Sequence, residues 1–116
     1  MLKEISFNCK GRKICVNAEN CNFLGKFFGL MFKSRENARA LLFEFRKPVK
    51  IKIHSLFVFF PFIAIWLDDN NKIVDFKFVK PFSFAISPKK SYNKLVEIPV
   101  NKKYRNLIKL LQLGCA

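Results

Sequence analysis

The sequence is poor in acidic residues, histidine and glycine, and it lacks a long apolar run. Its 116 residues include 8 Asp and Glu against 22 Lys and Arg, a net charge of +14, and one His. Such a composition leaves little material for acid–base catalysis, so an enzyme is not favoured. The four glycines form no phosphate loop. The longest apolar stretch, residues 56–67, contains Pro61 and is too short for a membrane helix, so we expect no membrane span.

The chain does contain enough apolar material for a core. Hydrophobic residues make up 51% of the sequence and 15 residues are Phe, which excludes a disordered chain. The length predicts a single domain over residues 1–116. No apolar stretch of signal-peptide length follows Met1, and we therefore expect a cytoplasmic protein.

The four cysteines have to be interpreted together with that compartment. They are Cys9, Cys15, Cys21 and Cys115. In a reducing compartment all four are expected to be free thiols. Their spacing does not match a zinc site, so neither a metal nor another cofactor is expected. One exception stays open, a Cys9–Cys15 bridge across the first hairpin.

Apolar periodicity predicts an α+β fold with a mainly antiparallel sheet, either open or curled into a small barrel. Alternation over residues 4–16 around Gly11 predicts a hairpin. Further strands are expected at residues 41–45, 50–53, 56–67, 73–79 and 94–99, with a short helix near 22–29 and a C-terminal helix at 102–113. The residues expected in the core are Phe43, Phe45, Phe59, Ile65, Phe76 and Phe78.

Several short blocks occur in an order that resembles a known family. They are residues 29–33 (GLMFK), 41–45 (LLFEF), 53–54 (IH), 57–61 (FVFFP), 67–68 (LD), 80–82 (KPF) and 88–90 (PKK). This order resembles the uncharacterised domain-of-unknown-function 192 family, especially its archaeal branch, over about residues 14–99. The family has no established activity, so the resemblance implies a fold and candidate positions but no reaction.

The sequence departs from the family pattern in two places. Ile63 stands where the family usually has an acidic residue, two positions after the Pro of the aromatic run. The helix-like residues 102–113 stand where the family has a Gly-Asp pair and a last strand.

The favoured functional hypothesis is a small binding module with a pocket for a small or anionic ligand. Its candidate residues are Met31, Lys33 and His54, because the blocks that resemble the family bring them into one fold. His54 is the sole residue that titrates near neutral pH when unperturbed, although a lone His at such a position is more often structural. Ser55 follows it directly and should point to the opposite side.

The alternative hypothesis is nucleic-acid binding by basic residues with exposed aromatics such as Phe82 and Tyr92 between them. Its candidate residues are Lys50, Lys52, Lys77, Lys80, Lys89 and Lys90. Because lysines are spread along the whole chain, an ordinary solvated surface is favoured over this one. An enzyme of unknown reaction is the third and weakest hypothesis.

Overall fold

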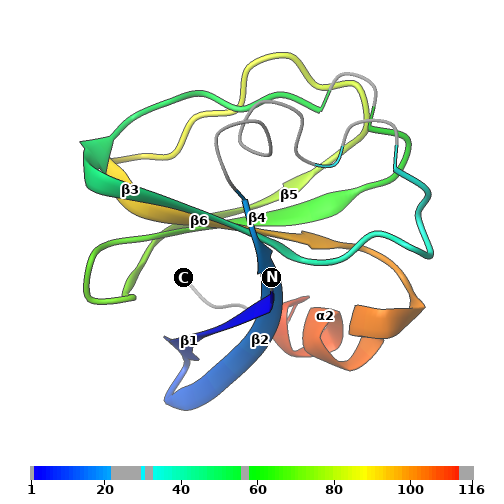
Figure 1. Ribbon diagram of the computed structural model, residues 1–116, viewed down its shortest axis with the longest axis horizontal. Helices are drawn as coiled ribbons and strands as arrows, with labels where there is room; N and C mark the ends of the chain where they lie inside the picture. Colours follow the sequence, from blue (N-terminus) through cyan, green and yellow to red (C-terminus); the bar gives the residue numbers. More distant parts are fainter. Residues whose placement is uncertain (1, 22–29, 31–32, 56–57, 113–116) are drawn as a thin grey trace.

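The computed structural model describes residues 2–21, 30, 33–55 and 58–112, which form six strands and a C-terminal helical segment (Figure 1). The elements are β1 (Leu2–Cys9), β2 (Arg12–Asn20), β3 (Leu41–Val49), β4 (Phe62–Leu67), β5 (Ile73–Val79), β6 (Tyr92–Pro99), the 3-10 helix η1 (Lys102–Tyr104) and α2 (Arg105–Gln112). The strands form one sheet in the order β1-β2-β3-β6-β4-β5. Every neighbouring pair is antiparallel except β2 and β3. The expected α+β fold with a mainly antiparallel, curled sheet is confirmed. The helix expected near 22–29 lies outside the described residues.

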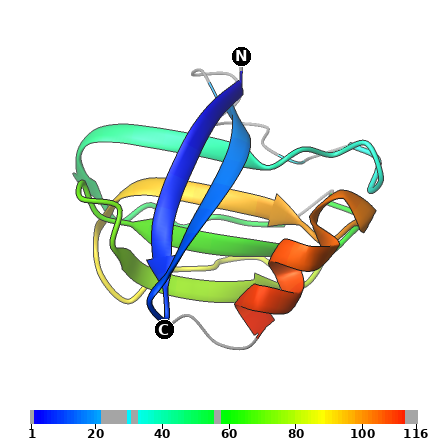
Figure 2. The ribbon, with the colours of Figure 1, turned by 90° about the horizontal axis from the view of Figure 1, so that it is seen from below.

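The hairpin of β1 and β2 turns at Lys10 and Gly11. Both residues have positive φ, 50° and 80°, as the tightest hairpin turns require, and glycine adopts this conformation without strain. The register pairs Cys9 with Arg12. Figure 2 shows that the hairpin crosses the other strands steeply beside α2, so the sheet curls over one of its own faces.

The strands β3, β6, β4 and β5 carry a separate core on each face. We call the side under the hairpin and α2 the hairpin-covered face, and the other side, under irregular segments, the loop-covered face. Side chains of β4 alternate between the two, with Ile63, Ile65 and Leu67 on the hairpin-covered face and Phe62, Ala64 and Trp66 on the loop-covered face. All six β4 residues are buried. A strand buried on both sides has a continuous apolar sequence.

The C-terminal segment closes the hairpin-covered face. Ile108 and Leu111 of α2 are buried against the strands. The hydroxyl of Tyr104 accepts a 2.7 Å hydrogen bond from the backbone N–H of Ala40, which fixes η1 to the start of β3. Within the described residues, no helix has the length and apolar character needed to cross a membrane.

Part of the expected secondary structure is wrong. Residues 50–53 form no strand and contribute one isolated bridge, between Ile53 and Ile86, and β4 begins only at Phe62. An alternating or apolar run becomes a strand only where a partner strand lies beside it, and the neighbours of β4 are already β5 and β6.

The expected core is correct in part. Phe43 and Ile65 are buried, and Phe45 and Phe76 are half-buried. The expectation is wrong for Phe59 and Phe78, whose side chains have exposed fractions of 59% and 49%. Phe59 lies before β4 rather than in it, and Phe78 lies on β5, the outer strand of the sheet, where less of each face is covered.

The expectation of four free thiols is also wrong. Cys9 is disulfide-bonded, whereas Cys15 and Cys21 are free, so the bridge does not join Cys9 to Cys15. Cys115 lies outside the described residues. The expectation rested on the compartment and the cysteine spacing, and the one bridge it left open, Cys9–Cys15, is not the one that forms.

Candidate functional site

The loop-covered face contains a buried carboxyl group, Glu97, in the middle of the sheet. Glu97 lies on β6, between β3 and β4, where it is paired with Leu41 on one side and Ala64 on the other. Only 6% of the residue is exposed. A buried carboxylate is costly unless it is paired or protonated. Glu97 is therefore an unusual chemical group for the middle of a sheet.

Small and aromatic residues surround this carboxyl. Ala64, directly opposite Glu97 on β4, is small and wholly buried. Trp66 is opposite Leu95 and therefore a diagonal neighbour of Glu97 on the same face, where Cα atoms are roughly 7–8 Å apart. Trp66 is wholly buried, and its Nε1 makes no hydrogen bond. An indole donor thus lies on the same face as the carboxyl.

Burial keeps the Glu97 carboxyl protonated at neutral pH. Desolvation raises the pKa of Glu97 from 4.5 to about 8. Within the described part of the chain, the one ion pair joins Lys3 Nζ and Glu44 Oε1 at 2.9 Å, so no described cation neutralises Glu97. A protonated carboxyl donates a hydrogen bond, whereas an ionised one only accepts.

The charge of Glu97 affects the pKa values of two further titratable groups, Cys21 and Tyr92. Burial, followed by the negative charge of Glu97, raises the pKa of Cys21 to about 11 and that of Tyr92 to about 12. The Tyr92 hydroxyl donates a 2.9 Å hydrogen bond to the carbonyl of Ile51. The indole N–H of Trp66 lies near enough to the Tyr92 hydroxyl to lower the pKa of Tyr92. Glu97, Cys21, Tyr92 and Trp66 form what we call the buried polar cluster.

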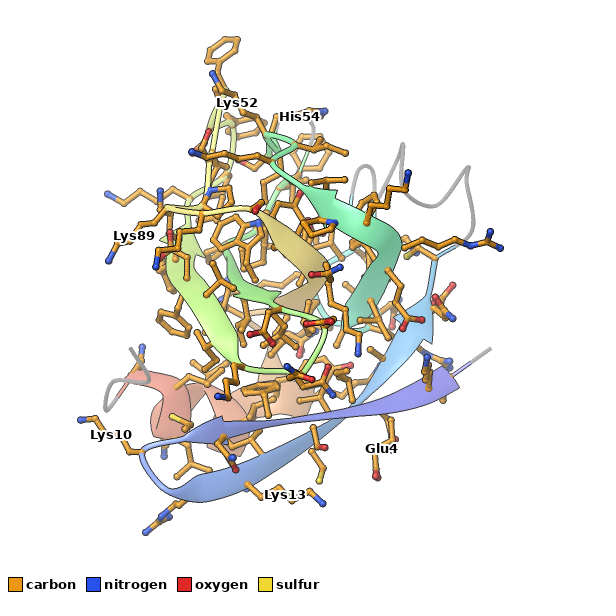
Figure 3. All side chains as sticks on the ribbon, turned by 90° about the vertical axis from the view of Figure 1, so that its left-hand side faces the viewer. Glu4, Lys10, Lys13, Lys52, His54 and Lys89 are labelled. Atoms are coloured by element: carbon orange, nitrogen blue, oxygen red, sulfur yellow. The ribbon has the colours of Figure 1, made fainter. Side chains whose placement is uncertain are left out.

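The predicted ligand residues have different relations to this cluster. Lys33 is exposed, and its positive charge lowers the pKa of Cys21, so Lys33 lies on the same side of the molecule as the cluster. His54 is exposed and lies at the end of the molecule far from the hairpin turn (Figure 3). Ser55 is buried, so the two neighbours do point to different sides, as expected. Met31 lies outside the described residues.

The six lysines of the nucleic-acid hypothesis are all exposed. Two of their segments are held by polar contacts: Lys77 Nζ donates to the carbonyl of Ser87 at 2.6 Å, and the backbone N–H of Lys89 donates to Asp75 Oδ2 at 2.9 Å. Of the two aromatic residues expected at this surface, Phe82 is exposed, but Tyr92 is buried. The expectation for Tyr92 is wrong because it lies on a strand at the centre of the sheet.

Sequence reasoning missed Glu97 as a functional candidate. The sequence did contain a signal, because Glu97 is the sole acidic residue of residues 92–99 and stands between two apolar residues, Val96 and Ile98. Trp66 and Cys21 gave no comparable signal, since an apolar strand and a polar loop commonly contain such residues. Among the described residues, no group of His, Cys, Asp and Glu has the arrangement of a metal site.

Comparison with known proteins finds one matching family model and several related archaeal proteins. The family model DUF192, described as an uncharacterized ACR, matches residues 10–109. A UPF0127 protein of Pyrococcus furiosus is 29% identical over 91 residues, which is 78% of each chain. A UPF0127 protein of Thermococcus kodakarensis is 33% identical over 79 residues, covering 67% of this chain and 50% of the relative.

A solved structure shares the fold. A protein of unknown function from Novosphingobium aromaticivorans superimposes with a TM-score of 0.73 at 12% sequence identity, covering 91% of this chain and 78% of that chain. At this identity the similarity concerns the fold alone.

Proposed function

Starting from a chain that belongs to the DUF192 family, whose description names no activity, we propose that this protein is a binding module for a small anionic or hydrogen-bond-accepting molecule. The observation that carries the proposal is the buried Glu97 carboxyl, diagonal to the buried indole N–H of Trp66. A buried donor without a hydrogen-bond partner, as Trp66 Nε1 is among the described residues, is rare in folded proteins and calls for an explanation such as a bound molecule.

The chemistry of the cluster favours an acceptor as ligand. With its pKa near 8, Glu97 is mainly protonated at pH 7 and can donate a hydrogen bond. Trp66 Nε1 is a second donor, and the charge of Lys33 acts on the same region. A carboxylate or phosphate group accepts from such donors, whereas an ammonium group would require Glu97 to be ionised.

The single tryptophan makes this proposal directly testable, because Trp66 is the chain's one Trp. Its fluorescence should change on titration with acetate, pyruvate or inorganic phosphate at pH 6.5, and the affinity should fall as the pH rises through about 8, where Glu97 ionises. No change with any of these probes at millimolar concentration would contradict an anion-accepting site.

Two substitutions test whether Glu97 acts as a hydrogen-bond donor whose ionisation causes the pH dependence. Glu97→Gln keeps a neutral donor of the same size, so binding should persist without its pH dependence. Glu97→Leu removes the donor and should abolish binding. The matched control is Glu4→Gln, which makes the same replacement at an exposed residue of β1, in the hairpin that covers the other face of the sheet. An equal effect of Glu4→Gln and Glu97→Gln on the pH profile would overturn the assignment.

A further inference from the structure

Acidic residues are absent from two basic segments of the chain, a feature that the net charge alone does not show. All eight acidic residues lie outside two segments, residues 45–67 and 76–96, which together hold nine Lys and Arg. Cationic segments free of acidic residues create a positive potential wherever the fold brings them together.

Backbone hydrogen bonds bring parts of the two segments together. Ile53 and Ile86 exchange N–H···O bonds of 2.9 and 2.8 Å. The backbone N–H of Ser55 donates to the carbonyl of Ser83 at 2.8 Å, and the backbone carbonyl of Ser55 accepts from the N–H of Phe82 at 2.9 Å. We call residues 50–55 and 80–86 the paired loops. Figure 3 places Lys52 and His54 at the end of the molecule opposite Lys10 and Lys13.

Apolar rings are exposed on and beside the paired loops. The exposed fractions are 55% for Phe82, 77% for Phe84 and 59% for Phe59, which precedes β4. The rings of Phe59 and Phe82 meet edge to face at a centroid distance of 5.6 Å. Single exposed apolar residues need no explanation, but a group of them among lysines indicates an interaction site.

One of these rings is held outward by a strained backbone. Phe82 has a φ of +62°, which is unfavourable for a bulky residue. The turn is held by the wholly buried Ser55, whose Oγ donates to the carbonyl of Lys80 and accepts from the N–H of Ser83, both at 2.6 Å. Strain of this kind persists where the surrounding structure imposes it, often at functional positions.

We propose that the paired loops bind single-stranded nucleic acid, with Phe82 and Phe84 stacking on bases and Lys50, Lys52 and Lys80 contacting phosphates. A single strand offers both chemistries at once, unpaired bases for the rings and a polyanionic backbone for the lysines. In a duplex the base faces are already stacked on one another, so the exposed rings would gain little. None of these five residues belongs to the buried polar cluster, whose link to the paired loops is the hydrogen bond from the Tyr92 hydroxyl to the carbonyl of Ile51.

The test is a fluorescence-anisotropy titration with a labelled single-stranded DNA oligonucleotide at two salt concentrations. Phe84→Ser and Phe82→Asn should each weaken binding by about 5- to 150-fold, the usual effect of losing one stacked base. Asn accepts a positive φ, so Phe82→Asn should fold at least as well as the wild type. Unchanged affinity in both variants, with thermal unfolding intact, would overturn the proposal.

Charge is tested with a matched pair of double variants. Lys50→Gln with Lys52→Gln should weaken binding and reduce the slope of log affinity against log salt by about 0.7 per lysine. Lys10→Gln with Lys13→Gln removes the same charge from the opposite end and should change the affinity much less. Equal losses in the two pairs would mean diffuse attraction to the net charge and would overturn the site.

Two further measurements exclude other ligands. Duplex DNA of the same sequence should bind more weakly than the single strand, and equal binding would contradict stacking. Vesicles containing phosphatidylserine should not compete with the oligonucleotide, and binding to vesicles alone would replace this proposal by a membrane surface. Glu97→Gln should leave the oligonucleotide affinity unchanged, so the two proposals fail separately.

Discussion

The two faces of the central sheet differ in chemistry although the same strands build both. The hairpin-covered face is closed by regular elements, β1, β2 and α2, which supply residues such as Ile5, Val16 and Leu111 to its core. The loop-covered face is closed by irregular segments that contribute residues such as Leu30, Ala38, Val58 and Phe60. Only this face also holds the Glu97 carboxyl and the Trp66 indole N–H. A face closed by loops can accommodate polar groups, because loops supply backbone partners at many angles, as Ile51 does for Tyr92.

The first prediction concerns the pH dependence of stability, where the difference between the faces is largest. The pKa of Glu97 rises from 4.5 to about 8 on folding. Between these values the unfolded chain has lost the proton and the folded chain keeps it, so stability falls with rising pH. The cost levels off above pH 8 at about 5 kcal/mol. Glu97→Gln should therefore equal the wild type near pH 4 and exceed its stability at pH 8.5 in urea unfolding.

The exposed Glu4→Gln provides the control for this prediction, since it makes the same replacement at an exposed carboxyl and should change stability little at any pH. A difference between Glu97→Gln and the wild type that does not vary between pH 4 and pH 8.5 would mean that Glu97 is not protonated in the folded protein.

The second prediction concerns the packing of the hairpin-covered face. Ile65 is wholly buried there, and Ile65→Ala should cost about 2–5 kcal/mol from lost burial and the cavity left behind. Phe84→Ala removes a larger side chain that is 77% exposed and should change stability by less than about 0.5 kcal/mol. Urea unfolding measures both, and similar losses would contradict the assigned burial.

The third prediction uses the two free thiols to compare the loop-covered side with the outer surface of the hairpin. Cys15 is exposed on β2. Burial, then the charge of Glu97, raises the pKa of Cys21 from 9.0 to about 11, which lowers its thiolate fraction at pH 8 about 100-fold. Iodoacetamide labelling followed by mass spectrometry should modify Cys15 long before Cys21.

Glu97→Gln sharpens this comparison. Removing the charge of Glu97 should speed the labelling of Cys21 above pH 8 and leave the labelling of Cys15 unchanged. Equal rates for the two thiols in the wild type would show that Cys21 is not buried near a carboxylate.

The fourth and smallest prediction concerns the contact that closes the hairpin-covered face. Tyr104→Phe removes the acceptor for the N–H of Ala40, a wholly buried residue. Leaving that donor without a partner should cost about 1–3 kcal/mol. The urea midpoint should shift while the slope of the transition stays the same. An unchanged midpoint would mean that η1 is not fixed to β3 by this bond.

Local signals in the sequence were sufficient for much of the fold. Period-two alternation around Gly11 predicted the hairpin, because glycine at a tight turn and apolar alternation act within a few residues. The apolar repeat of residues 102–113 predicted a helix that the structure has at Arg105–Gln112, preceded by η1. The order of short blocks correctly indicated the family.

Other features depend on contacts between distant segments, and the tertiary structure alone decided them. Residues 50–53 alternate like a strand, yet their partner is the loop at Ile86. Phe59 looks like a core residue but is exposed because β4 starts three residues later. Cys9 is disulfide-bonded because of the fold and in spite of the expected compartment.

The candidate site shows the same division. The sequence by itself determined that Glu97 shares one side of its strand with Leu95, because strand side chains alternate. Whether that side meets water or a second layer depends on β3 and β4, which flank β6, and on segments that cover them from far along the chain. Burial raises the pKa of Glu97, and burial is a property of the whole assembly of strands rather than of any stretch of sequence.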